Sequence, residues 1–196
     1  MGVSFNFLCV LNLEDFPKQV FFSGKTTLIS MISGVFPPTN GNSWVGKYNV
    51  QNETDLTHLL TGLCPQHGIL WEDLTVEEHL LFFSRLKGVP PKAENIHVER
   101  SLHSVGLTGA RKRYAKNLSG GMQRRLSIAL TLVGTSEVVL LDEPTTGLDP
   151  ASRRRVWSVI SDAKQSGDKA LILTTHSMDE ADLLSSRKLN TVSVRS

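Results

Sequence analysis

The stretch Val138-Val139-Leu140-Leu141-Asp142-Glu143-Pro144 places four aliphatic residues directly before two carboxylates. A continuous apolar run is typical of a strand buried on both faces, as in a parallel sheet covered by helices. Residues 137–141 therefore predict a buried strand, with the two acids at its carboxyl end. Ligands of open α/β sheets bind at the carboxyl ends of the strands, so this stretch indicates where a site would form. The alternative is a core strand that ends in a solvated acidic turn.

The segments on either side alternate between strand and helix patterns. Further strands are expected at residues 20–22, 61–64 and 170–175, the last of them buried. Helical periodicity is expected over residues 25–33, 75–87, 96–105, 119–133 and 151–164. Buried strands that alternate with helices predict a parallel sheet with helices packed on it. Because no strand is expected between residues 75 and 105, this part predicts a helical subdomain inserted into the α/β core.

A partial phosphate-binding motif opens the first predicted helix. Gly24-Lys25-Thr26-Thr27 matches the second half of G-x-x-x-x-G-K-[ST], in which backbone N–H groups cradle phosphates. In that motif the lysine reaches the β and γ oxygens, and the hydroxyl holds Mg²⁺. The first glycine would fall at position 19, which is Gln19, and Phe21-Phe22 stand where small residues are needed. The alternative is an ordinary helix N-terminus.

The two acids after the buried strand have the chemistry that a phosphate loop requires. Asp142 would steady the Mg²⁺ shell, and Glu143 would polarise an attacking water. Both would lie at the sheet edge where ligands of this fold class bind.

A second glycine motif, Leu118-Ser119-Gly120-Gly121-Met122, starts the long helix. Two glycines in a first helical turn cost roughly 1 kcal/mol each relative to alanine. A bare backbone N-terminus of this kind could approach an anion. The alternative is a loop-to-helix transition with a flexible entry.

Together these motifs resemble the nucleotide-binding domain of ATP-binding cassette (ABC) transporters, matching its Walker A end, Walker B and signature. Three more motifs resemble its Q-loop, D-loop and switch histidine: Cys64-Pro65-Gln66-His67, Gly147-Leu148-Asp149-Pro150 and Thr174-Thr175-His176-Ser177. The order and spacing of all six agree with the family over about residues 24–184. The sequences of four segments are most similar to those of the A subfamily, which includes many lipid exporters. These segments are residues 64–67, 74–79, 118–127 and 176–182.

The resemblance implies that the chain hydrolyses ATP with Mg²⁺ and that this hydrolysis drives transport. In the A subfamily the transported substrate would be a lipid. Two such domains would bind head to tail, with ATP between the Lys25 loop of one and the Ser119 helix of the other. Transmembrane domains outside this chain would hold it at the cytoplasmic face of a membrane. The resemblance implies that ATP is bound by Gly24, Lys25, Thr26, Thr27, Ser119, Gly120, Gly121 and Asp149. It implies that Mg²⁺ is bound by Thr26, Gln66 and Asp142. For catalysis it implies Glu143 as the base, His176 in contact with the γ-phosphate, and Gln66 as the sensor of the metal and the membrane domain.

Both ends of the chain depart from the family pattern. We expect a divergent segment at residues 1–23, a nucleotide-binding domain at 24–184 with its helical subdomain near 67–120, and a divergent tail at 185–196. The expected fold is therefore an incomplete ABC ATPase: a P-loop NTPase core with a mostly parallel sheet and an inserted α-helical subdomain. The departures also favour an alternative function, a truncated, non-hydrolysing interaction module that keeps the dimerising surface but has lost its phosphate cradle.

Composition excludes several classes of protein. The chain has 196 residues, 40% of them hydrophobic and 20% charged, which is typical of one globular domain and not of a disordered chain. Its net charge of +2 argues against nucleic acid as a partner, and so against an ABC ATPase acting on ribosomes or DNA. No apolar run approaches the length of about 18 residues needed to span a membrane. Histidines outside the switch motif, including His79, show no metal-ligand spacing and are expected on solvated or helical surfaces.

Overall fold

The computed structural model describes residues 25–38, 41–134, 136–165 and 169–184, which fall into two compact units. The first unit contains the described residues up to Thr61 and from Thr174 onward. The second unit is Gly62–Leu173. The strand expected at residues 20–22 and the predicted phosphate-loop residue Gly24 lie outside the described residues.

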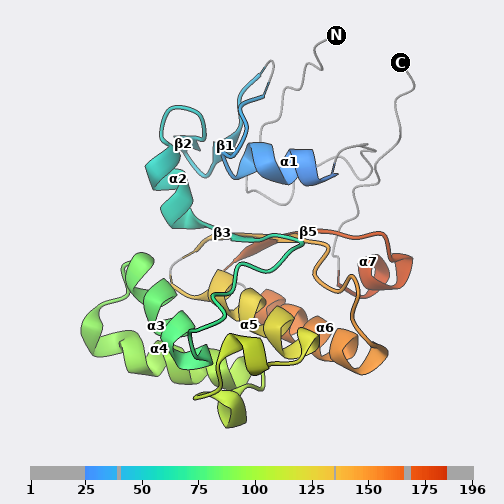
Figure 1. Cartoon of the computed structure of the whole chain (residues 1–196). Helices are drawn as coiled ribbons and strands as arrows, with labels where there is room; N and C mark the ends of the chain where they lie inside the picture. The colour runs from blue at the N-terminus through green and yellow to red at the C-terminus, as the bar shows by residue number, and fades with distance from the viewer. Residues whose placement is uncertain (1–24, 39–40, 135, 166–168, 185–196) are drawn as a thin grey trace. The chain divides into compact units, whose positions relative to one another are not determined.

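A parallel three-stranded sheet in the order β3-β4-β5 has all but its first and last residues in the second unit (Figure 1). These strands are β3 (Thr61–Cys64), β4 (Val138–Asp142) and β5 (Ala170–Thr174). The middle strand, β4, is buried along its whole length, as its apolar run predicts. The expectation that β5 is a buried strand is wrong: four of its five residues are half-buried.

Helices connect the strands, which confirms the α/β class. α3 (Val76–Leu86), α4 (Pro91–Ser104) and α5 (Gly120–Leu132) come between β3 and β4, with the short 3₁₀ helices η1 (Thr108–Ala110) and η2 (Ala115–Asn117). α6 (Pro150–Gln165) comes between β4 and β5. α3 packs against α4, and both pack against α5. Figure 1 shows α5 and α6 side by side on the same side of the sheet.

Two glycines allow α5 to approach its neighbours closely. A Cβ atom at Gly62, in β3, would lie 2.4 Å from the backbone oxygen of Thr131 in α5. A Cβ atom at Gly121, in the first turn of α5, would lie 2.3 Å from Oγ and 2.7 Å from Cβ of Ser152 in α6. Neither position can accept a side chain without movement of its neighbour, so helix packing requires glycine at both.

Capping residues begin the helices where the sequence predicts them. The Thr75 hydroxyl accepts from the Glu78 backbone N–H at 3.3 Å, and Glu78 Oε2 accepts from the Thr75 backbone N–H at 2.7 Å. This capping box starts α3. Ser119 Oγ accepts from the Met122 backbone N–H at 3.3 Å and caps α5. α4 begins at Pro91, earlier than predicted, because proline is favoured in the first turn of a helix.

The first unit contains the predicted helix α1 (Lys25–Ile32) and four short elements that the sequence did not reveal. These are β1 (Trp44–Val45), β2 (Tyr48–Asn49), α2 (Thr54–Leu60) and α7 (Met178–Leu184). β1 pairs antiparallel with β2, and α2 packs against β2. Two-residue strands and seven-residue helices are too short to show a period. Within the described ranges of both units, every helix is too short or too polar to cross a membrane.

Candidate active site

The carboxyl ends of β3 and β4 bring Gln66 and Glu143 together. Gln66 Nε2 donates to Glu143 Oε2 at 3.2 Å, and Thr146 Oγ1 donates to the same oxygen at 2.9 Å. Two residues from separate sequence motifs, 77 positions apart, therefore meet at the sheet edge that the parallel topology favours. Thr146 was not a predicted site residue, although its place three residues after Glu143 could have suggested it.

The backbone of Glu143 adopts an unusual conformation. Its φ is +45°, and no other non-glycine residue in the described ranges has a positive φ. The left-handed region costs roughly 1–2 kcal/mol for a residue with a side chain. Such strain persists only where the surroundings fix the backbone, and it is often found at functional sites. The preceding Asp142, the last residue of β4, is only 3% exposed, whereas the Glu143 side chain makes its hydrogen bonds at the surface.

Arg124 of α5 fixes this backbone and that of the neighbouring loop. Its guanidinium donates to five carbonyl oxygens: Nε to Pro144 at 2.8 Å, Nη1 to Pro65 at 2.6 Å and Gln66 at 3.4 Å, and Nη2 to Asp142 at 2.8 Å and Glu143 at 3.2 Å. Arg124 is 8% exposed, and these carbonyl dipoles replace the water that its charge loses. The two loops that carry Gln66 and Glu143 are thus attached to one side chain of a third element.

The predicted nucleotide-binding residue Asp149 caps α6. Its Oδ2 accepts from the backbone N–H groups of Ser152 at 3.0 Å and Ala151 at 3.1 Å. Hydrogen bonds from Ser152, first from its side chain and then from its backbone, hold the pKa of Asp149 below its ordinary value. A contact between Asp149 and nucleotide stays a prediction.

Three residues of the glycine motif, Ser119, Gly120 and Gly121, have different environments. Ser119 and Gly120 are exposed, and a Cβ atom at Gly120 would meet no described atom within 4 Å. Gly121 is buried against Ser152 of the same chain. Packing within the chain therefore explains the second glycine, while the first leaves the exposed start of α5 open to an anion.

The remaining predicted residues belong to the first unit. Lys25 begins α1, and Thr26 and Thr27 are exposed in its first turn. His176 follows β5, just after the loop residue Thr175. A common site formed by these residues and Glu143 stays a prediction.

His79 is buried, so the expectation of a surface position is wrong. Its Nδ1 donates to the Thr75 carbonyl at 2.8 Å, and its Nε2 accepts from the Trp71 backbone N–H at 3.0 Å. This pair of bonds requires a neutral ring. Burial lowers the pKa of His79, which agrees with that state.

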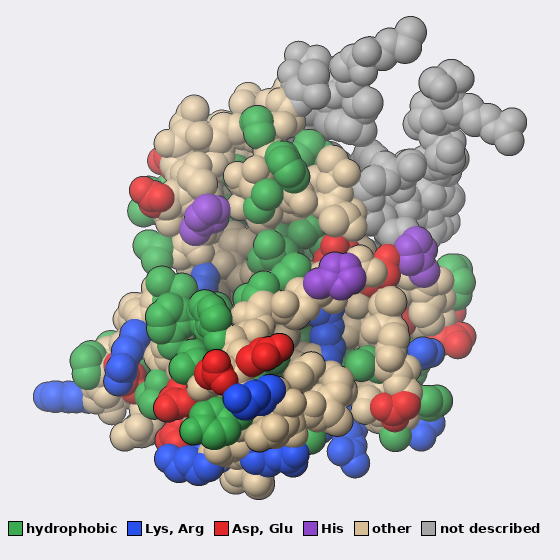
Figure 2. All heavy atoms as spheres, viewed as in Figure 1, with side chains coloured by type: hydrophobic (Ala, Val, Ile, Leu, Met, Phe, Trp, Pro, Cys, Tyr) green, Lys and Arg blue, Asp and Glu red, His purple; other side chains and the backbone are tan. Residues whose placement is uncertain are grey.

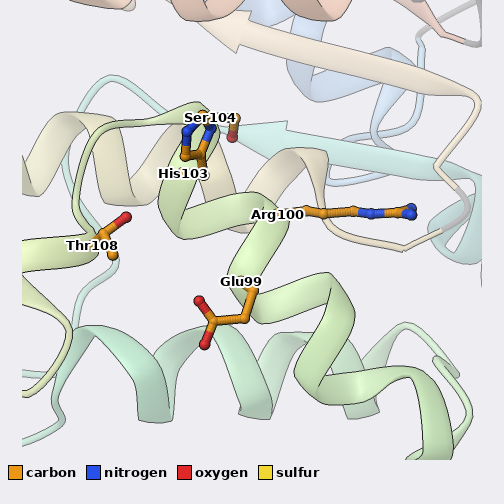
Figure 3. Close-up of a pocket in the computed structure, with 5 residues that line it drawn as sticks. All are labelled: Glu99, Arg100, His103, Ser104 and Thr108. Carbon is orange, nitrogen blue, oxygen red and sulfur yellow. The ribbon is translucent and has the colours of Figure 1, made fainter.

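A shallow hollow beside α4 contains none of the predicted site residues. It is lined by Glu99, Arg100, His103, Ser104 and Thr108. Figure 3 shows the Glu99 and Arg100 side chains pointing in different directions, and Glu99 pairs with Arg111 instead. Its polar groups do not converge on one point, so the sheet edge remains the better candidate.

Comparison with known sequences gives a family match and close relatives. Residues 23–146 match the family described as "ABC transporter". The chain is 47% identical to "ABC transporter A family member 2" of Arabidopsis thaliana, an alignment that covers 84% of this chain and 17% of the relative. It is 44% identical to "Phospholipid-transporting ATPase ABCA3" of Homo sapiens, an alignment that covers 90% of this chain and 11% of the relative. It is 45% identical to human "Retinal-specific phospholipid-transporting ATPase ABCA4", with 84% of this chain and 7% of the relative covered. The chain thus spans less than a fifth of the length of these relatives.

Comparison with solved structures supports the fold. A chain described as "Structure of ATP binding subunit of ABC transporter" matches with a TM-score of 0.72 and 23% identity. The match covers 82% of this chain and 67% of the other. It confirms the expected P-loop NTPase fold of the ABC ATPase type.

Proposed function

The chain belongs to the ABC transporter family, and we propose that it binds and hydrolyses ATP to drive an A-type transporter. The observation that carries the proposal is the pairing of Gln66 with Glu143 at the carboxyl ends of two parallel strands. Lipid is the proposed cargo, because the names of two relatives describe them as phospholipid-transporting.

The donor set fits Mg²⁺ with ATP. A hydroxyl on Thr26, an amide on Gln66 and the Asp142 carboxylate offer the hard oxygen ligands that Mg²⁺ prefers. Mg²⁺ in such sites takes one or two protein carboxylates and completes its shell with phosphate and water. When bound, the ion would neutralise charge on the transferred phosphoryl group.

Glu143 is proposed as the general base. A base must hold its carboxylate at the water it activates, and geometry comes before basicity. The strained turn and the two hydrogen bonds to Oε2 fix the Glu143 carboxylate, so little reorganisation is needed. Lys25 would bind the β and γ phosphates, and His176 would contact the γ-phosphate.

The exposed start of α5 is the proposed contact with a second nucleotide-binding domain. Ser119 and Gly120 lie at the N-terminus of a 13-residue helix, which favours an anion such as the γ-phosphate of the partner's ATP. Transmembrane domains are the second proposed partner, and they would place the chain at the cytoplasmic face of a membrane.

ATP turnover by the full chain with Mg²⁺ tests this function. We expect measurable hydrolysis that falls by about 10²-fold or more in Lys25→Ala, because the variant lacks the phosphate-binding cation. Absence of turnover in the parent, or turnover that Lys25→Ala leaves unchanged, would contradict the proposal.

A second candidate function rests on Gln19 and Phe21-Phe22, which lie outside the described residues. If two or three phosphate hydrogen bonds are missing, at roughly 1.5–3 kcal/mol each, the loss is roughly 3–9 kcal/mol. That is about two to six decades in affinity. A non-hydrolysing interaction module would then bind Mg-ATP only in the millimolar range or worse.

Isothermal titration separates the two candidates. The parent is compared with a variant in which residues 19–23 are replaced by a glycine-rich segment. Millimolar binding by the parent, recovered in the variant, supports the interaction module. Micromolar binding by the parent supports the ATPase.

A further inference from the structure

We propose that Arg124 is a positioning residue for hydrolysis, which sets the place of Glu143 by attaching two loops to helix α5. These strand-end loops are residues 65–66 after β3 and, at the end of β4, its last residue Asp142 with residues 143–146. The inference rests on the proposed ATPase function for its kinetic consequence, but its structural part can be tested without activity.

One guanidinium holds three consecutive carbonyls at the strained turn. Asp142, Glu143 and Pro144 each accept from Arg124, at 2.8, 3.2 and 2.8 Å. The residue at the centre of this run has the positive φ. Three anchors on three successive peptide groups leave that turn little freedom, which is the condition for strain to persist.

The same guanidinium also reaches the Gln66 loop. Its Nη1 donates to the carbonyls of Pro65 at 2.6 Å and Gln66 at 3.4 Å. The hydrogen bond from Gln66 to Glu143 therefore joins two side chains whose backbones are held by one group. Movement of either loop against the other must break bonds to Arg124.

Only a planar fork can make this arrangement. Arginine presents five N–H donors in fixed directions, whereas lysine has three donors on one atom. A lysine at position 124 keeps a buried positive charge but cannot serve both loops. Arg124→Lys is therefore a conservative change in charge and a severe change in geometry.

The place of Arg124 in α5 adds a mechanical consequence. It lies four residues after Gly120, about 6 Å along the helix axis at 1.5 Å per residue. A shift of the exposed helix start on binding an anion is thus transmitted to the carbonyls beside Glu143. Arg124 connects the surface proposed for the second domain to this chain's own base.

Arg125 provides a matched control in the same helix. It is 6% exposed, and its Nη1 donates to the carbonyls of Val105 at 2.5 Å and Gly106 at 3.2 Å. The two arginines share burial, charge and bonding to backbone oxygens. They differ in the loop that they hold, because Val105 and Gly106 follow α4.

The experiment compares Arg124→Lys with Arg125→Lys in the full chain. Amide hydrogen exchange is measured first, without nucleotide. We expect at least about tenfold faster exchange in the strand-end loops of Arg124→Lys, and faster exchange near residues 105–107 in Arg125→Lys. ATP turnover is then expected to fall at least about tenfold in kcat for Arg124→Lys, with KM for ATP within about threefold. Arg125→Lys should keep kcat within about threefold of the parent.

Three outcomes would overturn the inference or locate its failure. Unchanged exchange in the strand-end loops shows that Arg124 does not hold them. Faster exchange with an unchanged kcat shows that their position does not matter for hydrolysis. If Lys25→Ala leaves turnover unchanged, the proposed function fails, while the exchange result still decides the structural part. Arg124→Gln is measured in parallel and, should Arg124→Lys not fold, carries the same expectations.

Discussion

The strand-end loops and the helical segment, residues 72–117 with α3 and α4, are both attached to helix α5 by a buried arginine. They are otherwise held in different ways. The loops are fixed by buried and part-buried hydrogen bonds to backbone oxygens around a strained turn. The outer face of the helical segment has ion pairs in contact with solvent, and Figure 2 shows acidic and basic side chains beside one another there.

The ion pairs of the helical segment share a few acids. Arg111 pairs with Glu77 and Glu99, and Lys112 Nζ lies 2.6 Å from Glu77 Oε2. Lys116 Nζ lies 2.7 Å from Asp73 Oδ1. Exposed pairs contribute about 0–1 kcal/mol each, whereas a buried polar group that loses its partner costs more. The proposed site is therefore specified by contacts from a buried arginine to the backbone, whereas the helical surface tolerates change.

The largest change in stability is expected at Gly121, and the adjacent Gly120 should not show it. Gly121→Ala places a methyl group against Ser152 and should reduce the free energy of unfolding by about 1–3 kcal/mol. Gly120→Ala adds a methyl group at an exposed position and should leave stability unchanged or raise it by up to about 1 kcal/mol, because alanine is the better helix former. Urea unfolding of both variants measures this. Adding Ser152→Gly should restore most of the loss in Gly121→Ala, and equal effects at the two glycines would contradict the close approach of α5 to α6.

His79 tests whether the helical segment also has a buried polar anchor. Burial puts its pKa below the ordinary value of about 6.5, so the unfolded chain binds a proton first as pH falls. Its stabilising effect is therefore present above pH of about 6.5 and lost on acidification through the lower folded pKa. Protonation of His79 Nε2 breaks the hydrogen bond that it accepts from the Trp71 N–H. The free energy of unfolding should therefore fall by about 1 kcal/mol.

The free energy of unfolding is measured at about pH 7.5 and about pH 5.5, on either side of the ordinary histidine pKa of about 6.5. His79→Gln should show a smaller decrease than the parent. His103→Gln, at an exposed position on the same segment, should behave as the parent. An identical pH dependence in all three proteins would rule out His79 as the anchor.

The smallest effect is expected at Glu77. Hydrogen bonds from Arg111 and then Lys112 lower the pKa of Glu77 to about 2. Its stabilising effect is thus present above its ordinary pKa and lost as pH falls through about 2. Glu77→Gln at neutral pH should cost about 1 kcal/mol or less, and 1 M salt, with a Debye length of about 3 Å, should reduce that cost. A salt-independent loss above about 2 kcal/mol would show that these pairs act as buried ones.

Patterns that repeat within one element were predictable from the sequence. The apolar run of β4 shows its burial, and Thr75 with Glu78 shows the start of α3. The meeting of Gln66 and Glu143 follows from parallel topology, because carboxyl ends of parallel strands share one edge.

Contacts that depend on how the helices pack were not predictable. Arg124 and Arg125 are adjacent and chemically identical, and only the packing of α5 shows which loop each one holds. Gly120 and Gly121 likewise differ only in the presence of Ser152. His79 looks like a polar helix residue until the Trp71 backbone is placed beside it.

Turnover of Mg-ATP by Glu143→Gln tests whether Glu143 is the general base. The change keeps the size of the side chain but removes the base, so turnover should fall by about 10²-fold or more. ATP affinity should stay within about threefold of the parent. Glu137→Gln, at an exposed position just before the same strand, is the control and should retain parental turnover. Turnover of Glu143→Gln within about threefold of the parent would contradict the assignment of Glu143 as the base.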